Sequence, residues 1–197
     1  MSDVHEKDME TVAMTAADGE VVEKEFTVSL LAGNIYGTLM GLIPALLLLG
    51  IFSLVWIGRQ VTPPPQGFGL LHIVALLVAG IVVHELLHGL GWMVFAGVPR
   101  SEIHIGVKWK LLTPYAHTPV RMPVRGYCWG AFLPGLLLGI LPTLLAIAGG
   151  SFVLLGFGFF FTVAAGGDFL ILWLLRNVPV GAQVADHPSR VGAIVYL

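Results

Sequence analysis

Four long apolar stretches dominate the pattern of hydrophobic and polar positions along the chain. Each is long enough for the roughly 20 residues that a membrane-spanning helix needs. They lie near Leu31–Ile57, Gly69–Ala96, Gly126–Ala148 and Phe152–Leu175. Prolines occur inside some of them, and membrane helices tolerate proline where neighbouring helices satisfy the freed carbonyl groups. The pattern predicts an all-α polytopic membrane protein with about four transmembrane helices.

Residues 97–125 form the only long connection between these stretches. From Ile103 to Leu111 apolar and polar residues alternate, which is the period of two that a half-buried strand shows. Several prolines follow and interrupt regular structure. We expect a short β-strand or hairpin in this connection.

Residues 1–28 are polar and acidic, and this composition predicts a flexible N-terminal tail. Within it, Val21–Val28 alternates enough to favour a short strand or an interfacial segment. A basic segment followed by a short apolar core and a cleavage site is not seen, so we expect no cleaved signal peptide. Residues 29–197 are then expected to form a single membrane domain.

The composition agrees with a membrane location. Of the 197 residues, 56% are hydrophobic and 11% are charged, whereas a typical soluble domain carries about 25% charged residues. The formal net charge of −2 gives no sign of nucleic-acid binding. Cys128 is the one cysteine, so it cannot form an intrachain disulfide, and we expect it to be a small buried hydrophobe.

Basic residues lie mostly on one side of the predicted membrane domain. With four spans, the N-terminus, the connection 97–125 and the C-terminus share a side, and the other side carries only Arg59. The positive-inside rule places the basic side in the cytoplasm. We therefore expect an integral protein of the plasma membrane with both termini cytoplasmic.

The second apolar stretch contains the sequence His84-Glu85-Leu86-Leu87-His88. Two histidines four residues apart on a helix differ by only about 40° in direction, so both imidazoles reach one point. In the His-Glu-x-x-His arrangement of zinc hydrolases, the histidines are ligands and the glutamate is the general base. The alternative is a chance match, but a central carboxylate alone costs roughly 2.5–3.5 kcal/mol on membrane-insertion scales. We favour one Zn²⁺ ion on His84 and His88, with Glu85 as the base.

A catalytic zinc ion usually takes three protein ligands and leaves one position for water. The candidates for the third ligand are Glu102, His104, His117, Asp168, Asp186 and His187. Only Asp168 lies within a predicted span. At about 1.5 Å of rise per residue, it lies within about one helical turn of the two histidines in height. We predict Asp168 as the third ligand, and the alternative is a polar residue that is hydrogen-bonded across helices.

The chain resembles the site-2 protease group of intramembrane metalloproteases, in which such a motif precedes an aspartate in a later membrane helix. It resembles more closely a family of putative membrane zincin peptidases. The resemblance is carried by His84–Gly89, Pro114–His117, Gly167-Asp168 and Asp186–Pro188. It implies a zinc-dependent intramembrane peptidase that acts on a peptide or membrane-protein substrate in or near the bilayer. The chain departs from site-2 proteases at Ala164–Gly167, where their Asn-Pro element and its oxyanion-stabilising asparagine have no counterpart.

Weaker candidates lie in the connection between the second and third stretches. Tyr115 and His117 stand in a proline-flanked segment that could fold over the site and donate to the oxyanion. For His117 the alternative is a solvated loop residue. The predicted strand could hold an extended substrate by edge-strand addition, and ordinary interfacial packing is the alternative.

Two other functions remain open at this point. A catalytically inactive scaffold or sensor would bind the metal, but it would not need Glu85. A small transporter would line a pathway with polar residues stacked through the bilayer, whereas here they cluster at one depth.

Overall fold

The computed structural model describes residues 22–108 and 113–197. Within them, three helices are long and apolar enough to cross a membrane. They are α2 (Leu30–Trp56), α3 (Leu70–Ala96) and the continuous helix Val124–Gly149. The last one begins as α4 (Val124–Pro134), widens into the π-helical segment η2 (Gly135–Ile140) and ends as α5 (Leu141–Gly149). Their ends differ from the predicted stretches by at most two residues, because the length of an apolar run largely determines the length of a membrane helix.

Local signals set the ends of these helices. The Ser29 hydroxyl accepts a hydrogen bond from the Ala32 N–H at 3.2 Å and caps the start of α2. Gly97 and Gly150 follow α3 and α5 with φ of 69° and 71°. This left-handed conformation favours glycine and ends a helix.

The fourth apolar stretch is not one straight helix. It consists of α6 (Phe152–Ala164) and α7 (Gly166–Leu175), which are bent by 45° at Ala165. At this bend the backbone of α2 comes very close, because a Cβ atom at Gly41 would lie 2.5 Å from the Val163 carbonyl oxygen. The described residues therefore contain three candidate spans, or four if the bent pair counts as one.

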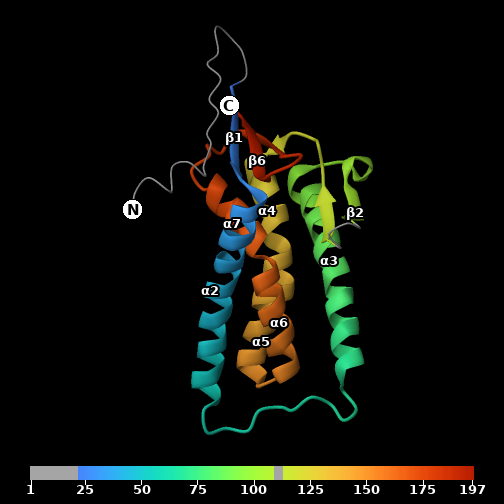
Figure 1. Cartoon of the computed structure of the whole chain (residues 1–197), viewed down its shortest axis with the longest axis vertical. Coiled ribbons are helices and arrows are strands. Elements are labelled where there is room, and N and C mark those ends of the chain that lie inside the picture. Colours follow the sequence, from blue (N-terminus) through green and yellow to red (C-terminus); the bar gives the residue numbers. More distant parts are fainter. Residues whose placement is uncertain (1–21, 109–112) are drawn as a thin grey trace.

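The helices run side by side along the long axis of the molecule (Figure 1). In this arrangement α3 packs mainly against α4, while α2 packs against α6 and α7. Many of the outward side chains are large and apolar; Leu47 and Val94 are each 65% exposed. Such a surface suits lipid, because soluble monomers rarely expose large contiguous apolar patches.

A four-stranded antiparallel sheet lies at one end of the helices (Figure 1). Its strands, in spatial order, are β1 (Glu23–Val28), β6 (Val191–Tyr196), β5 (Gln183–Asp186) and β4 (Met122–Pro123). Val184 and Val195 are fully buried and pack in one cluster with Trp92 and Tyr127. The sheet corrects the expectation of an all-α fold with only one short β element.

Strand β1 lies within the segment whose acidic composition predicts a tail. Its six residues pair with β6 from Glu23 opposite Tyr196 to Val28 opposite Val191. The sequence allows either a short strand or an interfacial segment at Val21–Val28, and the structure has a strand there, over Glu23–Val28. Residues 1–21 lie outside the described part of the chain.

The connection between α3 and α4 contains a second, two-stranded sheet. After the short helix η1 (Arg100–Glu102), strand β2 (His104–Lys108) pairs antiparallel with β3 (Thr113–His117). Gly106 stands opposite Tyr115 in this pair. The end of the predicted strand, from Trp109 to Leu111, falls outside the described residues. Strand β3 contacts α3 and so brings the connection to the helix that carries the histidine motif.

Candidate metal centre

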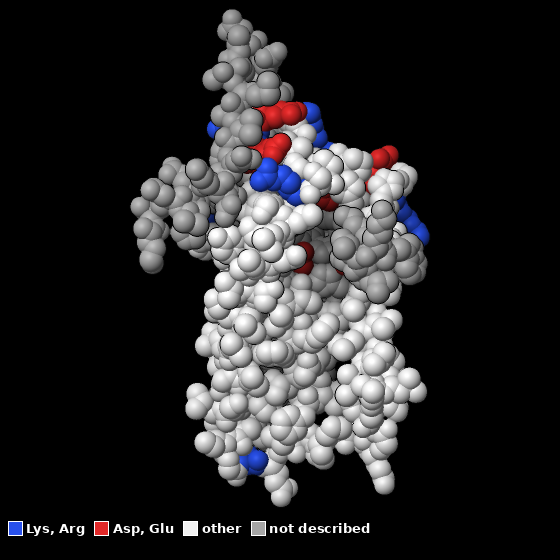
Figure 2. All heavy atoms as spheres, viewed as in Figure 1, with Lys and Arg blue, Asp and Glu red and all other residues white. Residues whose placement is uncertain are grey.

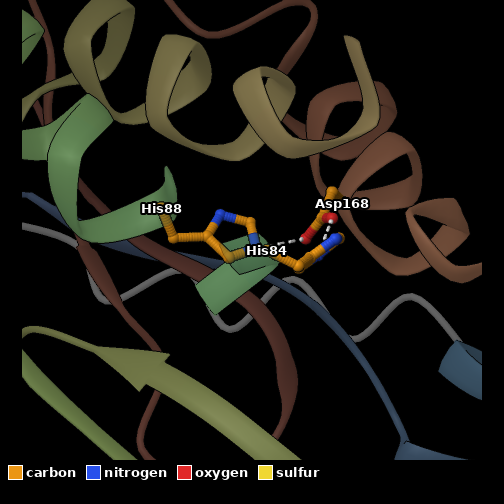
Figure 3. A group of neighbouring side chains, drawn as sticks. All are labelled: His84, His88 and Asp168. Atoms are coloured by element: carbon orange, nitrogen blue, oxygen red, sulfur yellow. Dashed lines mark ion pairs between the residues drawn. The ribbon is translucent and has the colours of Figure 1, made fainter. Parts of the chain in front are cut away.

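His84, His88 and Asp168 converge at one point between α3 and α7 (Figure 3). The Nε2 atom of His84 lies 3.2 Å from Oδ2 of Asp168. The Nε2 atom of His88 lies 3.4 Å from Oδ1 of the same carboxylate. Within the described part of the chain, these three residues form a group in which one donor atom from each lies within 4.8 Å of the others.

The donor set and its spacing fit a zinc ion. Two atoms that each lie about 2.1 Å from a tetrahedral ion are about 3.4 Å apart, close to the two separations between imidazole and carboxylate. Asp168 Oδ2 is buried and accepts no hydrogen bond of good geometry among the described residues, although His84 Nε2 lies 3.2 Å away. A buried carboxylate that faces only neutral imidazoles is costly, and a bound cation would remove that cost.

The His88 ring is oriented by a backbone carbonyl of the neighbouring helix. Its Nδ1 atom lies 3.0 Å from the Gly130 oxygen, so Nδ1–H donates and Nε2 keeps its lone pair for a metal. Such an outer partner typically fixes the ring of a metal-ligating histidine. The contact depends on glycine, because a Cβ atom at Gly91 would lie 2.6 Å from the Gly130 Cα.

Asp168 owes its position to the bend in the fourth stretch. Because α7 begins anew at Gly166, Asp168 lies in the first turn of a helix, where the helix dipole stabilises a negative charge. Gly37 of α2 packs against this turn, since a Cβ atom there would lie 3.2 Å from the Gly167 backbone nitrogen. The contact between α2 and α7 thus helps to place the carboxylate beside α3.

A cavity of about 260 Å³ adjoins the three residues. Glu85 and Tyr115 line it, as do Tyr127 and Asp186. Figure 2 shows acidic atoms recessed in a hollow where the apolar helical body meets the charged end of the molecule. Glu85 is half-buried, and Ala116 of β3 lines the same cavity. The glutamate therefore stands beside the histidines, in a space large enough for water and part of a substrate.

Asp186 joins three elements at the sheet end of this cavity. It accepts a hydrogen bond from the Tyr127 hydroxyl at 2.6 Å and one from the Thr118 N–H at 3.2 Å. His117 Nδ1 lies 3.2 Å from the same carboxylate. Two weak sequence motifs, the one ending at His117 and the one starting at Asp186, therefore meet in space.

Tyr127 is the side chain of this network that the sequence does not single out, while Thr118 contributes its backbone N–H. Tyr127 is only 1% exposed, and a buried tyrosine hydroxyl usually needs a partner. In the sequence it appears only as a single tyrosine near the start of an apolar stretch. That signal does not identify Asp186 as the partner.

The remaining candidate ligands stand apart from the three-residue group. His187 Nε2 lies 3.6 Å from Glu25 Oε2, and its Nδ1 accepts a hydrogen bond from the Arg190 N–H at 2.8 Å. Glu102 and His104 lie in η1 and β2 and do not line the cavity. Among the described residues, Asp168 is the carboxylate that faces both motif histidines.

One comparison with known proteins identifies a family. A family model described as putative zincin peptidase matches residues 77–183, more than half of the chain. The matched region runs from α3 to the start of β5 and contains His84, His88 and Asp168, while Asp186 lies just beyond it. No curated protein and no solved structure matches the chain.

Proposed function

We propose that this chain, which belongs to the putative zincin peptidase family, is a zinc-dependent peptidase that hydrolyses peptide bonds in or near the membrane. The observation that carries the proposal is the convergence of His84, His88 and Asp168 within 4.8 Å. Glu85 stands beside them in the same cavity. Both histidines lie on a helix that is apolar enough to cross a bilayer.

The proposed roles follow from the chemistry of each side chain. Zinc held by His84, His88 and Asp168 would polarise the scissile carbonyl and lower the pKa of a water molecule. Glu85 takes a proton from the attacking water and passes it to the leaving amine, a role worth about 10²–10⁴-fold in rate. Tyr115 lines the cavity, and we assign its hydroxyl to the developing oxyanion.

An extended segment is the form of substrate that suits this cavity. Tyr115 and Ala116 of β3 line the cavity together with Glu85, and among the described strands β3 pairs on one side only, with β2. The edge of β3 beside the base could therefore pair with an extended peptide, as edge strands commonly do. A membrane helix would have to unwind locally, because its own hydrogen bonds occupy the backbone groups.

The cavity lies at the sheet end, where the charged residues gather (Figure 2). We place this end, with both termini, in the cytoplasm and the protein in the plasma membrane. The distribution of lysine and arginine between the two sides supports this orientation, because Arg59 is the one lysine or arginine between Lys24 and Arg100. Water then enters the site from the cytoplasmic side.

The test combines metal analysis with cleavage of transmembrane peptides by the purified full chain. Wild-type protein and Glu85→Ala should each carry about one zinc ion, and only the wild type should cleave. Glu102→Ala is the matched control and should keep both properties, because Glu102 lies outside the cavity. Zinc binding by wild-type protein without cleavage of any peptide would favour the scaffold or sensor. A wild type without zinc would reject the metal centre itself.

A further inference from the structure

A second cavity of about 460 Å³ lies between the start of α4 and the end of α7. We call it the α4–α7 groove. Its walls include the apolar side chains of Cys128, Phe132 and Leu172. Arg125, at the start of α4, and Arg176, just past the end of α7, belong to the same lining. The groove is thus apolar along the helices and cationic at one end.

The two guanidinium groups stand at the level where the helices meet the sheet end. Both side chains are exposed, and neither forms an ion pair within residues 22–108 and 113–197. Arg176 is held in place, because its guanidinium lies 4.1 Å from the Trp173 ring centroid and donates to the Trp173 carbonyl at 2.7 Å. Two positive charges that have no acidic partner in the described part of the chain therefore border an apolar groove at the edge of the membrane body.

We propose that the α4–α7 groove binds one anionic phospholipid, with its phosphate on Arg125 and Arg176 and an acyl chain along Phe132 and Leu172. Guanidinium groups bind phosphate oxygens in bidentate geometry, and the apolar walls match a hydrocarbon chain. A zwitterionic headgroup is a poorer match, because its own ammonium group already balances the phosphate. A free phosphate ion would leave the apolar walls without a partner.

The groove borders the metal centre without being part of it. Its α7 wall includes Leu175, which lies about two helical turns after Asp168. Its α4 wall is next to Gly130, the carbonyl partner of His88. A lipid that bridges α4 and α7 should therefore raise the melting temperature of the protein. This inference does not depend on peptidase activity.

The test measures lipid binding to the full chain in detergent by native mass spectrometry. Phosphatidylglycerol should bind at one site about 30-fold more tightly than phosphatidylcholine, if each arginine contributes as basic residues near an anionic membrane do. The double variant Arg125→Gln/Arg176→Gln should lose most of this preference. The matched pair Arg59→Gln/Arg100→Gln should keep it, because both of these arginines lie outside the groove. Equal affinity for the two lipids, or equal loss in both variant pairs, would overturn the proposal.

Two further measurements separate a lipid site from a simple anion site. Val180 lines the groove and is 57% exposed, so Val180→Trp should fill the groove while keeping the arginines and the core. This variant should bind phosphatidylglycerol several-fold more weakly, and unchanged binding would contradict an acyl chain in the groove. Glycerol phosphate should not compete at equal concentration, and competition as strong as that of the lipid would overturn the phospholipid assignment. Circular dichroism and the melting temperature without lipid check that each variant is folded.

Discussion

The Nδ1 atom of His88 lies 3.0 Å from the carbonyl oxygen of Gly130, so α4 orients a candidate zinc ligand that α3 carries. The two helices touch at the backbone, where Gly91 meets Gly130. The Trp92 ring stacks between His88 and Tyr127, with centroid distances of 5.8 and 6.0 Å. One helix contact thus links the metal centre to the network around Asp186.

Substitution of Gly91 tests this contact. In Gly91→Ala the new methyl group would lie 2.6 Å from the Gly130 Cα, so the helices must separate and the His88 hydrogen bond must lengthen. We expect zinc affinity to fall about 10–100-fold, as it does when an outer partner of a metal ligand is lost. Competition with a chelator measures the affinity. Gly50→Ala is the control, since a Cβ atom at Gly50 meets nothing within 4 Å, and equal affinities in both variants would contradict the prediction.

Two aspartates in the cavity should respond differently to the same change. Asp168→Asn removes a negatively charged ligand, so zinc affinity should fall by more than the roughly 100-fold upper limit for outer partners. Asp186→Asn should keep the zinc. It should instead lower the free energy of unfolding by about 1.5–3 kcal/mol, because Tyr127 and Thr118 lose a charged acceptor. The measurements are the metal content and the thermal unfolding of both variants. Loss of zinc from Asp186→Asn but not from Asp168→Asn would make Asp186, and not Asp168, the zinc ligand.

The bend between α6 and α7 should depend on Gly41. In Gly41→Ala the methyl group would lie 2.5 Å from the Val163 carbonyl oxygen, which pushes α2 away from the bend that places Asp168. We expect a loss of about 1–3 kcal/mol in the free energy of unfolding and weaker zinc binding. Gly156→Ala on α6 is the matched control, because its Cβ position is open. An unchanged melting temperature and zinc affinity in Gly41→Ala would show that the bend does not need this approach.

Tyr115 is the proposed oxyanion donor, and removal of its hydroxyl tests this role. Tyr115→Phe should lower kcat by about 10²–10³-fold, the usual cost of losing one oxyanion donor. Zinc content should not change, because Tyr115 is not part of the ligand group. Tyr36→Phe on α2 serves as the control, since Tyr36 packs against Val28 and Leu170 away from the cavity. A normal kcat for Tyr115→Phe would remove the tyrosine from the mechanism.

Much of the helical body follows from the sequence alone. The apolar stretches near 31–57 and 69–96 match α2 and α3 within one residue, because the span of a bilayer is a one-dimensional constraint on the chain. Helical periodicity places His84 and His88 on one face of α3. The rise per residue also predicts that Asp168 lies at their height, and the structure brings the three together.

The sheet and the Asp186 network do not follow from local patterns. Strand β1 pairs with β6 from the other end of the chain, and the contact between His117 and Asp186 joins residues 69 positions apart. Strand β6 does contain β-branched residues. That composition favours a strand but does not name its neighbours, which only packing can select.

What the sequence by itself determined is which segments are long and apolar enough to cross a membrane, and that His84 and His88 share one face of a helix. Both depend on local quantities, namely the length of an apolar run and the angular spacing of a helix. The tertiary structure decided where α7 begins, which carbonyl orients His88 and which strands surround the cavity. These depend on close approaches between distant backbones, such as Gly41 with Val163 and Gly91 with Gly130. Steric fit between two segments is a property of the pair, so neither segment encodes it alone.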